Sequence, residues 1–231
     1  MSIVGFIGFL GFMTLLSSII DVFIHLDIHL AEVIAQYGML TYAILFVIIF
    51  CETGLVVTPF LPGDSLLFAA GAFAALGSLN IVVLLVLLWI AAVLGDTVNY
   101  HLGRMIGPRV FKENRWFLNK EKLMAAERFY EIHGNKAILF ARFVPIIRTL
   151  APFVAGVGRM NYSKFIFWNL FGGTLWVLLC LFAGYFFGNI PFVKEHFTVV
   201  ILGIIAVSLI PPVYHAIREK LRPKDSPRVI R

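Results

Sequence analysis

The sequence predicts an all-α membrane protein with two oppositely oriented re-entrant helical hairpins, related as an inverted repeat, together with three to four transmembrane helices and amphipathic interfacial helices. Hydrophobic residues make up 60% of the 231 residues and charged residues 14%, whereas soluble domains are about 45–50% apolar and about 25% charged. Two apolar segments, 40–77 and 137–160, are broken by prolines and carry ionisable side chains. Basic residues gather beside the apolar spans, as they do in cytoplasmic loops. The length fits a single membrane domain over residues 1–231.

The segment 1–37 is predicted to form N-terminal apolar and interfacial helices. Residues 3–20 are apolar and glycine-rich and only marginally long enough to span a bilayer, so a span and an interfacial helix are both open, with a span favoured. The rest of this segment mixes polar and aliphatic side chains, which favours a helix in the interface plane. His25, His29 and Glu32 would share a helix face, but no further His or Cys cluster completes a metal site. We therefore expect neither a metal nor a cofactor.

Residues 40–77 are predicted to form the first re-entrant hairpin. Glu52 interrupts the first apolar arm, the turn around Pro62 breaks the chain, and apolar sequence resumes after Asp64. Two half-length arms around a Pro-Gly turn are typical of a helix pair that enters and leaves the bilayer on one side. A full span needs about 20 residues, so neither arm is long enough to cross by itself. The alternative is a pair of short tilted spans joined by a tight external turn.

A transmembrane helix is predicted over 79–103, followed by a cytoplasmic amphipathic loop over 104–136. Asp96 and Asn99 are three residues apart and share a helix face, which we expect to look inward. The loop holds eight Lys and Arg residues against four Glu, and its apolar residues recur at three-to-four spacing. This pattern favours a helix on the cytoplasmic membrane surface. Because acids are spread among the bases, we expect no nucleic acid to bind.

Residues 137–160 are predicted to form the second re-entrant hairpin. Arg142 and Arg148 lie six residues apart in apolar sequence, with Pro145 between them and Pro152 after them. An arginine at bilayer depth is costly, and an internal proline removes a backbone donor, so a plain spanning helix would suffer from all four residues. A segment of this kind usually lines a protected cavity and handles charge there.

Two further transmembrane helices are predicted over 163–188 and 198–217, and the tail, 218–231, is rich in Lys and Arg. This basic tail is expected in the cytoplasm. With the tail in the cytoplasm, each preceding span places the next connection on the opposite side. The second hairpin is then expected to open to the cytoplasm and the first hairpin to the outer face. Residues 66–71 resemble residues 151–156, an apolar similarity that fits an inverted repeat.

Four ionisable residues fall within the two hairpins, and opposed hairpins would bring the acids and the bases together across a shared cavity. The planar guanidinium fork suits a phosphate, which makes Arg142 and Arg148 the candidate head-group ligands. Desolvation favours a neutral carboxyl group while a nearby arginine favours the charged form, so Glu52 and Asp64 are candidates for proton coupling or gating. The competing interpretation is that all four form ion pairs that only fix the hairpins. The residues expected to support the site are Asp96, Asn99, Pro62 and Pro145.

Three motifs resemble the DedA family of integral membrane proteins. They are Glu52-Thr53-Gly54 with Pro59-Phe60-Leu61-Pro62-Gly63-Asp64, then Gly95-Asp96-Thr97-Val98-Asn99-Tyr100, then Phe140-Ala141-Arg142-Phe143-Val144-Pro145-Ile146-Ile147-Arg148. Five later residues continue the pattern, namely Met160, Phe165, Asn169, Gly172 and Trp176. The resemblance covers roughly residues 25–218 with its spacing intact, and the apolar N-terminal stretch departs from it.

This resemblance implies a multi-pass protein of the bacterial inner membrane that moves lipids between leaflets, in particular undecaprenyl phosphate back to the cytoplasmic face. It implies that the acids and arginines matching Glu52, Asp64, Arg142 and Arg148 are needed for function, and that proton motive force takes part. The expected partners are thus a lipid phosphate, protons and the bilayer itself.

The alternative function is a proton- or ion-coupled antiporter that supports envelope homeostasis. An enzyme is not expected, because a lipid phosphatase would need a nucleophile or a histidine pair near the arginines, whereas His133 precedes the second hairpin and the next histidine is His196. Small residues allow close helix contacts, either within the chain or in a homo-oligomer. These residues are Gly172, Gly173, Gly184 and Gly188.

Overall fold

The computed structural model describes residues 26–55, 63–110, 134–142, 145–188, 190–196, 199–200 and 203. All regular structure within these ranges is helical and they contain no strand, which confirms the predicted all-α class. Several predictions lie outside the described residues. They are the apolar stretch 3–20, the turn at Pro62, most of the amphipathic loop, nearly all of the span 198–217 and the basic tail.

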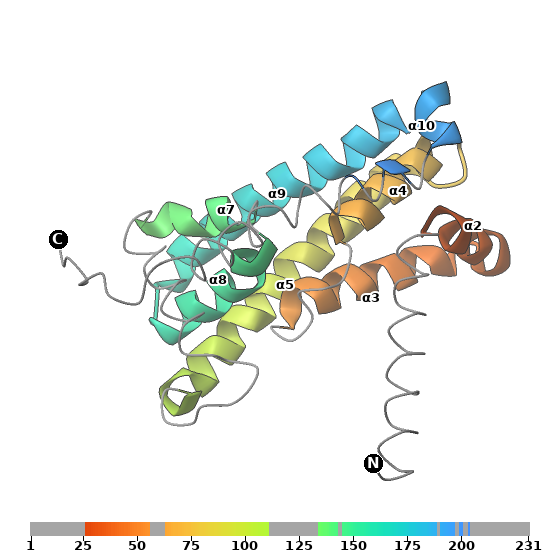
Figure 1. Cartoon of the computed structure of the whole chain (residues 1–231). Coiled ribbons are helices and arrows are strands. Elements are labelled where there is room, and N and C mark those ends of the chain that lie inside the picture. The colour runs from red at the N-terminus through yellow and green to blue at the C-terminus, as the bar shows by residue number, and fades with distance from the viewer. Residues whose placement is uncertain are drawn as a thin grey trace, which may run out of the picture.

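Two long helices run through the molecule, and shorter helices pack along them (Figure 1). In chain order the elements are α2 (Leu26–Tyr37), α3 (Leu40–Gly54), α4 (Gly63–Ala75), α5 (Ile81–Val110), η1 (Gly134–Lys136), α7 (Ala137–Ala141), α8 (Pro145–Val157), α9 (Tyr162–Phe187) and α10 (Pro191–Glu195). Each predicted hairpin thus consists of two helices with a break between them, α3 and α4 in one case and α7 and α8 in the other. Each pair is followed by a long helix.

The long helices α5 and α9 are the two candidate membrane spans among the described residues. Their apolar parts, Ile81–Ile106 and Tyr162–Phe187, each hold 26 residues, which at about 1.5 Å per residue exceeds the hydrocarbon thickness of about 30 Å. An asparagine caps each start. The Asn80 side chain accepts a hydrogen bond from the Val82 N–H at 2.9 Å, and that of Asn161 accepts one from the Ser163 N–H at 2.9 Å.

Helix α5 continues to Val110, beyond the end predicted at residue 103. Gly103 lies inside the helix with its α-carbon against the backbone of Phe153, where any side chain would overlap the Phe153 carbonyl. The glycine serves a close helix contact and does not end the helix.

The second helix of each pair packs along the long helix of the other half, α4 on α9 and α8 on α5, whereas the first helix of each pair, α3 or α7, packs on the long helix of its own half. Glycines make both crossings close. A Cβ on Gly71 would overlap the Leu181 carbonyl and one on Gly184 the Phe68 carbonyl, while a Cβ on Gly156 would overlap the Tyr100 carbonyl. The similar segments 66–71 and 151–156 therefore occupy corresponding contacts, which are made without any bulky side chain between the backbones.

Two apolar clusters of the described residues stabilise the bundle and leave a polar layer between them. The larger one joins α3, α4, the first half of α5 and the second half of α9, and the smaller one centres on Tyr100 and Phe165. Along α5, Asp96 lies between Ala92 of the larger cluster and Tyr100 of the smaller one. Asn169 occupies the corresponding interval on α9, between Phe165 and Trp176.

Gly184→Leu is expected to lower the free energy of unfolding by about 1–3 kcal/mol, because the new side chain collides with the Phe68 carbonyl and forces α4 away from α9. Thermal unfolding of the detergent-solubilised protein measures the effect. Gly203→Leu is the matched control, since a Cβ there meets nothing within 4 Å. Equal losses in the two variants would contradict the close crossing.

Candidate functional site

Arg148 joins the two broken helix pairs. It lies in the first turn of α8, and its Nη2 donates to Glu52 Oε1 in the last turn of α3. Its Nη1 donates to Asp64 Oδ1, at 2.7 Å, in the first turn of α4. Arg148 is 7% exposed and Glu52 2% exposed, so this is a buried ion-pair cluster. The sequence-predicted acids of the first pair and one base of the second are brought together here.

Trp176 of α9 completes this cluster. Its indole N–H donates to Asp64 Oδ1 at 2.7 Å, and the guanidinium carbon of Arg148 lies 4.5 Å from the centre of its ring. The tryptophan thus contacts both charges of one ion pair, holding the carboxylate by a hydrogen bond and the guanidinium by a cation–π contact. Four helices, α3, α4, α8 and α9, contribute to the site.

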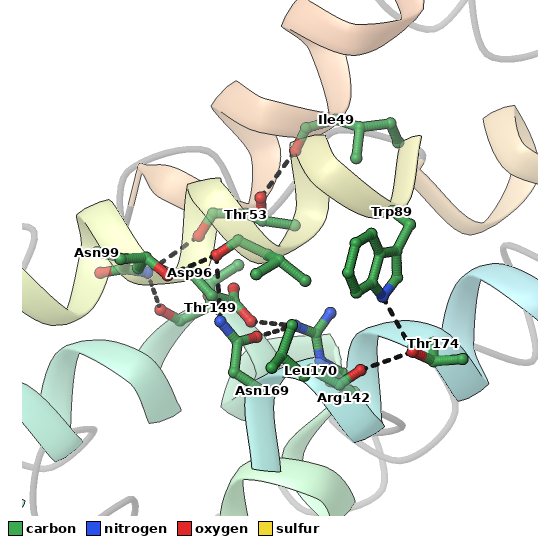
Figure 2. A network of polar contacts seen from close by, with 12 residues as sticks. Ile49, Thr53, Trp89, Asp96, Asn99, Arg142, Thr149, Asn169, Leu170 and Thr174 are labelled. Carbon is green, nitrogen blue, oxygen red and sulfur yellow. Dashed lines mark hydrogen bonds and ion pairs between the residues drawn. The ribbon is translucent and has the colours of Figure 1, made fainter. Parts of the chain in front are cut away.

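Arg142 belongs to a second cluster. Its Nη2 donates to Asp96 Oδ2 on α5 and to Asn169 Oδ1 on α9 (Figure 2). The amide of Asn169 in turn donates to the Val93 carbonyl at 3.1 Å, which fixes its orientation. The sequence predicts that the acids and bases of the two hairpins face one another, and for Arg142 the buried face of α5 supplies the carboxylate that it contacts, Asp96.

Asn99 ties the two broken pairs to α5. Its side-chain amide donates to the Thr53 carbonyl at 3.1 Å and to the Thr149 carbonyl at 2.8 Å (Figure 2). The Thr53 carbonyl is in the last turn of α3, where no later helical N–H can reach it, so the asparagine supplies a donor that the helix lacks. Asp96 and Asn99 do face inward as the three-residue spacing predicts, with 2% and 0% exposure.

Two glycines make room for the buried charges. A Cβ on Gly63, the first residue of α4, would overlap the Glu52 carboxylate, which therefore lies against the N-terminus of that helix. A carboxylate at a helix N-terminus is favoured by the helix dipole. Gly172 makes room for the Arg142 side chain, since a Cβ on Gly172 would lie 3.1 Å from Arg142 Cδ and 3.2 Å from Arg142 Nε.

Several buried polar atoms in these clusters have no hydrogen-bond partner among the described residues. They are Glu52 Oε2, Asn99 Oδ1, Arg142 Nε, Arg142 Nη1 and Arg148 Nε. Native proteins leave few such atoms unpaired, so these donors and acceptors are available for further hydrogen bonds. Within the described ranges no three His, Cys, Asp or Glu side chains converge as metal ligands do.

Two residues of the site were not singled out as site residues from the sequence. Asn169 and Trp176 entered only as part of a family pattern. A signal for Asn169 was available in the sequence, since a polar amide in an apolar span usually faces the inside of a bundle. For Trp176 the signal was its position in the middle of the span, because Trp in membrane proteins is enriched near the ends of spans. Of the predicted supporting prolines, Pro145 begins α8, a position that tolerates proline, and Pro62 lies outside the described residues.

Asp96→Leu is expected to destabilise the protein by about 3–5 kcal/mol, because Arg142 is left as a buried charge without its carboxylate. The double variant Asp96→Leu with Arg142→Met should recover most of that loss, since no buried charge remains. Thermal unfolding in detergent measures both. A double variant no more stable than the single one would mean that Asp96 stabilises the fold by some other contact.

The comparisons with known proteins agree on one family. The profile of the VTT domain matches residues 61–186. Protein DedA of Escherichia coli (strain K12) is 54% identical over 211 residues, which cover 90% of this chain and 96% of that protein. An uncharacterized membrane protein of Mycobacterium leprae is 43% identical over 184 residues, covering 78% and 82%. Inner membrane protein YqjA of Escherichia coli (strain K12) is 40% identical over 159 residues, covering 68% and 71%. No solved structure matches significantly.

Proposed function

Because the chain belongs to the DedA family of membrane proteins, whose VTT domain it carries, we propose that it moves a lipid phosphate between the leaflets of a membrane. The proposed substrate is undecaprenyl phosphate or a related phospholipid, returned to the cytoplasmic face of a bacterial inner membrane. Protons are the proposed coupling ion. The C-terminal tail is placed in the cytoplasm in this proposal, and one relative is named an inner membrane protein.

The observation that carries the proposal is the buried pairing of Arg148 with two carboxylates from a different part of the chain. A guanidinium group that binds carboxylates also binds a phosphate, which offers the same planar pair of acceptor oxygens. The phosphate must compete with Glu52 and Asp64 for the same donors. Protonation of either acid weakens its hold on Arg148, so uptake of protons favours binding of the anionic head group.

The helix lengths support re-entrant hairpins. Helices α3, α4 and α8 hold 15, 13 and 13 residues, which at about 1.5 Å per residue is short of a hydrocarbon core of about 30 Å. Their broken ends bring Glu52, Asp64 and Arg148 to one place between the long spans. In the proposed topology the two pairs open on opposite faces, so the head group can reach this place from either side while the lipid tail stays in the bilayer.

A proton- or ion-coupled antiporter is the second candidate function. The excess of carboxylates over arginines in the site supports it. Three buried or half-buried carboxylates, those of Glu52, Asp64 and Asp96, accompany two arginines. Carboxylates inside a membrane commonly relay protons or bind cations, and such a site needs no lipid.

Leaflet exchange separates the two candidates. Purified protein is reconstituted in liposomes that contain labelled undecaprenyl phosphate. The protein is expected to accelerate movement of the lipid between leaflets, and an imposed pH gradient is expected to increase the rate further. Empty liposomes give the background rate. Proton flux without any acceleration of lipid exchange would contradict lipid transport and support the antiporter.

Arg148→Ala is expected to lower the rate of lipid exchange by at least about a hundredfold. Each charge-assisted contact to the head group contributes roughly 1.5–3 kcal/mol, and two such contacts are lost. Insertion and folding are checked by chromatography in detergent, because Glu52 and Asp64 lose their partner. Arg159→Ala, an arginine outside both clusters, serves as the control. Normal exchange by Arg148→Ala would contradict its assignment to the head group.

Asp64→Asn is expected to reduce the dependence of exchange on the pH gradient while head-group binding is retained. The amide keeps the size of the carboxyl group and can still accept from the Trp176 N–H, but it cannot take up a proton. Exchange rates are measured across a series of imposed gradients. A variant with an unchanged gradient dependence would show that Asp64 is not a coupling residue.

A further inference from the structure

The three charged residues of the Arg148 cluster differ in exposure. The Asp64 side chain is 29% exposed, whereas those of Arg148 and Glu52 are 7% and 2% exposed. Arg148 binds the two acids through different nitrogens, Nη1 for Asp64 and Nη2 for Glu52. An anion that reaches this guanidinium group therefore meets Asp64 first, and it can replace that carboxylate while Glu52 stays bound.

Trp176 binds the same carboxylate oxygen that Arg148 binds. The indole N–H and Arg148 Nη1 each donate to Asp64 Oδ1 at 2.7 Å. Trp176 is 2% exposed and belongs to the long helix α9, not to either broken pair. The contact of the indole with Asp64 is thus separate from the ion pair between Asp64 and Arg148.

An Asp64 carboxylate that has lost Arg148 needs other stabilisation. The charge-assisted hydrogen bond from the buried indole is one source. The place of Asp64 in the first turn of α4 is another, because the helix dipole favours a negative charge there. The guanidinium carbon of Arg148 lies 4.5 Å from the centre of the indole ring, so the ring also stabilises the cation. Trp176 can therefore stabilise both members of this ion pair while they are apart.

We propose that Trp176 is a positioning residue of the transport site. A phosphate monoester head group takes the place of Asp64 on Arg148, while the indole N–H retains the displaced carboxylate and the indole face retains the guanidinium group. Trp176 acts through these two residues and is not a ligand of the head group. This inference rests on the proposed function and deepens it, because it names the residue that lets one anion replace another at Arg148.

Trp176→Phe removes the N–H donor and keeps an aromatic face. The full-length protein is used, with farnesyl phosphate as the binding probe in detergent and a fluorescent polyprenyl phosphate as the exchange probe in liposomes. The displaced carboxylate then lacks the indole, so binding of farnesyl phosphate is expected to weaken about tenfold and exchange to slow to a similar extent. Unchanged or tighter binding would overturn the proposal.

Trp89→Phe is the matched control. It also removes an indole hydrogen bond between two helices, since Trp89 Nε1 of α5 donates to Thr174 Oγ1 of α9 at 2.9 Å. This bond lies outside both charged clusters, so binding and exchange are expected to stay within about twofold of the wild type. Equal losses in Trp89→Phe and Trp176→Phe would overturn the proposal, because helix packing would then explain both. Thermal unfolding establishes that each variant is folded.

A double-variant cycle with Asp64→Asn separates positioning from packing. With an amide at position 64 there is no carboxylate to retain, so adding Trp176→Phe is expected to weaken binding of farnesyl phosphate by less than about twofold. A packing role of the indole would instead give the same tenfold loss in both backgrounds. That outcome would overturn the proposal.

Trp176→benzothienylalanine gives an independent measure and decides if Trp176→Phe does not fold. This analogue keeps the size and the face of the indole ring but carries sulfur in place of the N–H. Binding is expected to weaken about tenfold, as in Trp176→Phe. Binding at the wild-type affinity would show that the hydrogen bond to Asp64 has no part in the exchange of anions.

The wild-type protein distinguishes failure of this inference from failure of the proposed function. If it neither binds farnesyl phosphate nor exchanges the lipid, both are overturned together. If the wild type does both and the tryptophan variants match it, only the positioning role is overturned. Inorganic phosphate is tested in parallel as an anion without a lipid tail. Its binding is expected to be much weaker, and binding as tight as that of farnesyl phosphate would overturn the assignment to a lipid head group.

Discussion

The need to pair buried charge governs this structure. Arg148 cannot lie in an apolar bundle by itself, and the carboxylates of Glu52 and Asp64 cannot either, so each requires the other. These residues belong to the broken ends of helices that are far apart in the sequence. The ion pairs therefore fix where α3, α4 and α8 end or begin, and Trp176 connects this point to a long span. Replacing a whole buried ion pair by well-packed apolar residues is often neutral or stabilising, so these charges specify how the helix ends meet more than they add to stability.

The packing of the helices complements this constraint. The second helix of each pair, α4 or α8, crosses the long helix of the other half with backbone against backbone, at Gly71 and Gly184 in one crossing and at Gly103 and Gly156 in the other. Close crossings of this kind leave no side chains to hold the helices apart, so α5 and α9 each contact both halves of the chain. Asn99 adds a polar link from α5 to α3 and α8. The charged layer is thereby contacted by α3, α8 and both long helices.

Much of this arrangement could be predicted from the sequence, and the remainder depends on contacts in space. Glu52, Asp64, Arg142 and Arg148 are conspicuous because a charge in an apolar segment is costly wherever the segment lies. The inward face of Asp96 and Asn99 follows from helical spacing. The partner of Arg142 could not be predicted, since the choice between Asp96 and the acids of the first hairpin depends on how α5 packs. The glycines allow close helix contacts, but their partners, such as the Phe153 backbone against Gly103, depend on how the helices pack.

The polar layer lies between two apolar clusters of the described residues along α5 and α9, and this affects its electrostatics. Apolar side chains cannot reorient dipoles around a charge, so charges in this layer are weakly screened. The interactions of Arg142 with Asp96 and of Arg148 with Glu52 are therefore stronger than the same pairs would be at an exposed surface. Dissolved salt, which weakens exposed ion pairs, has little access to these two.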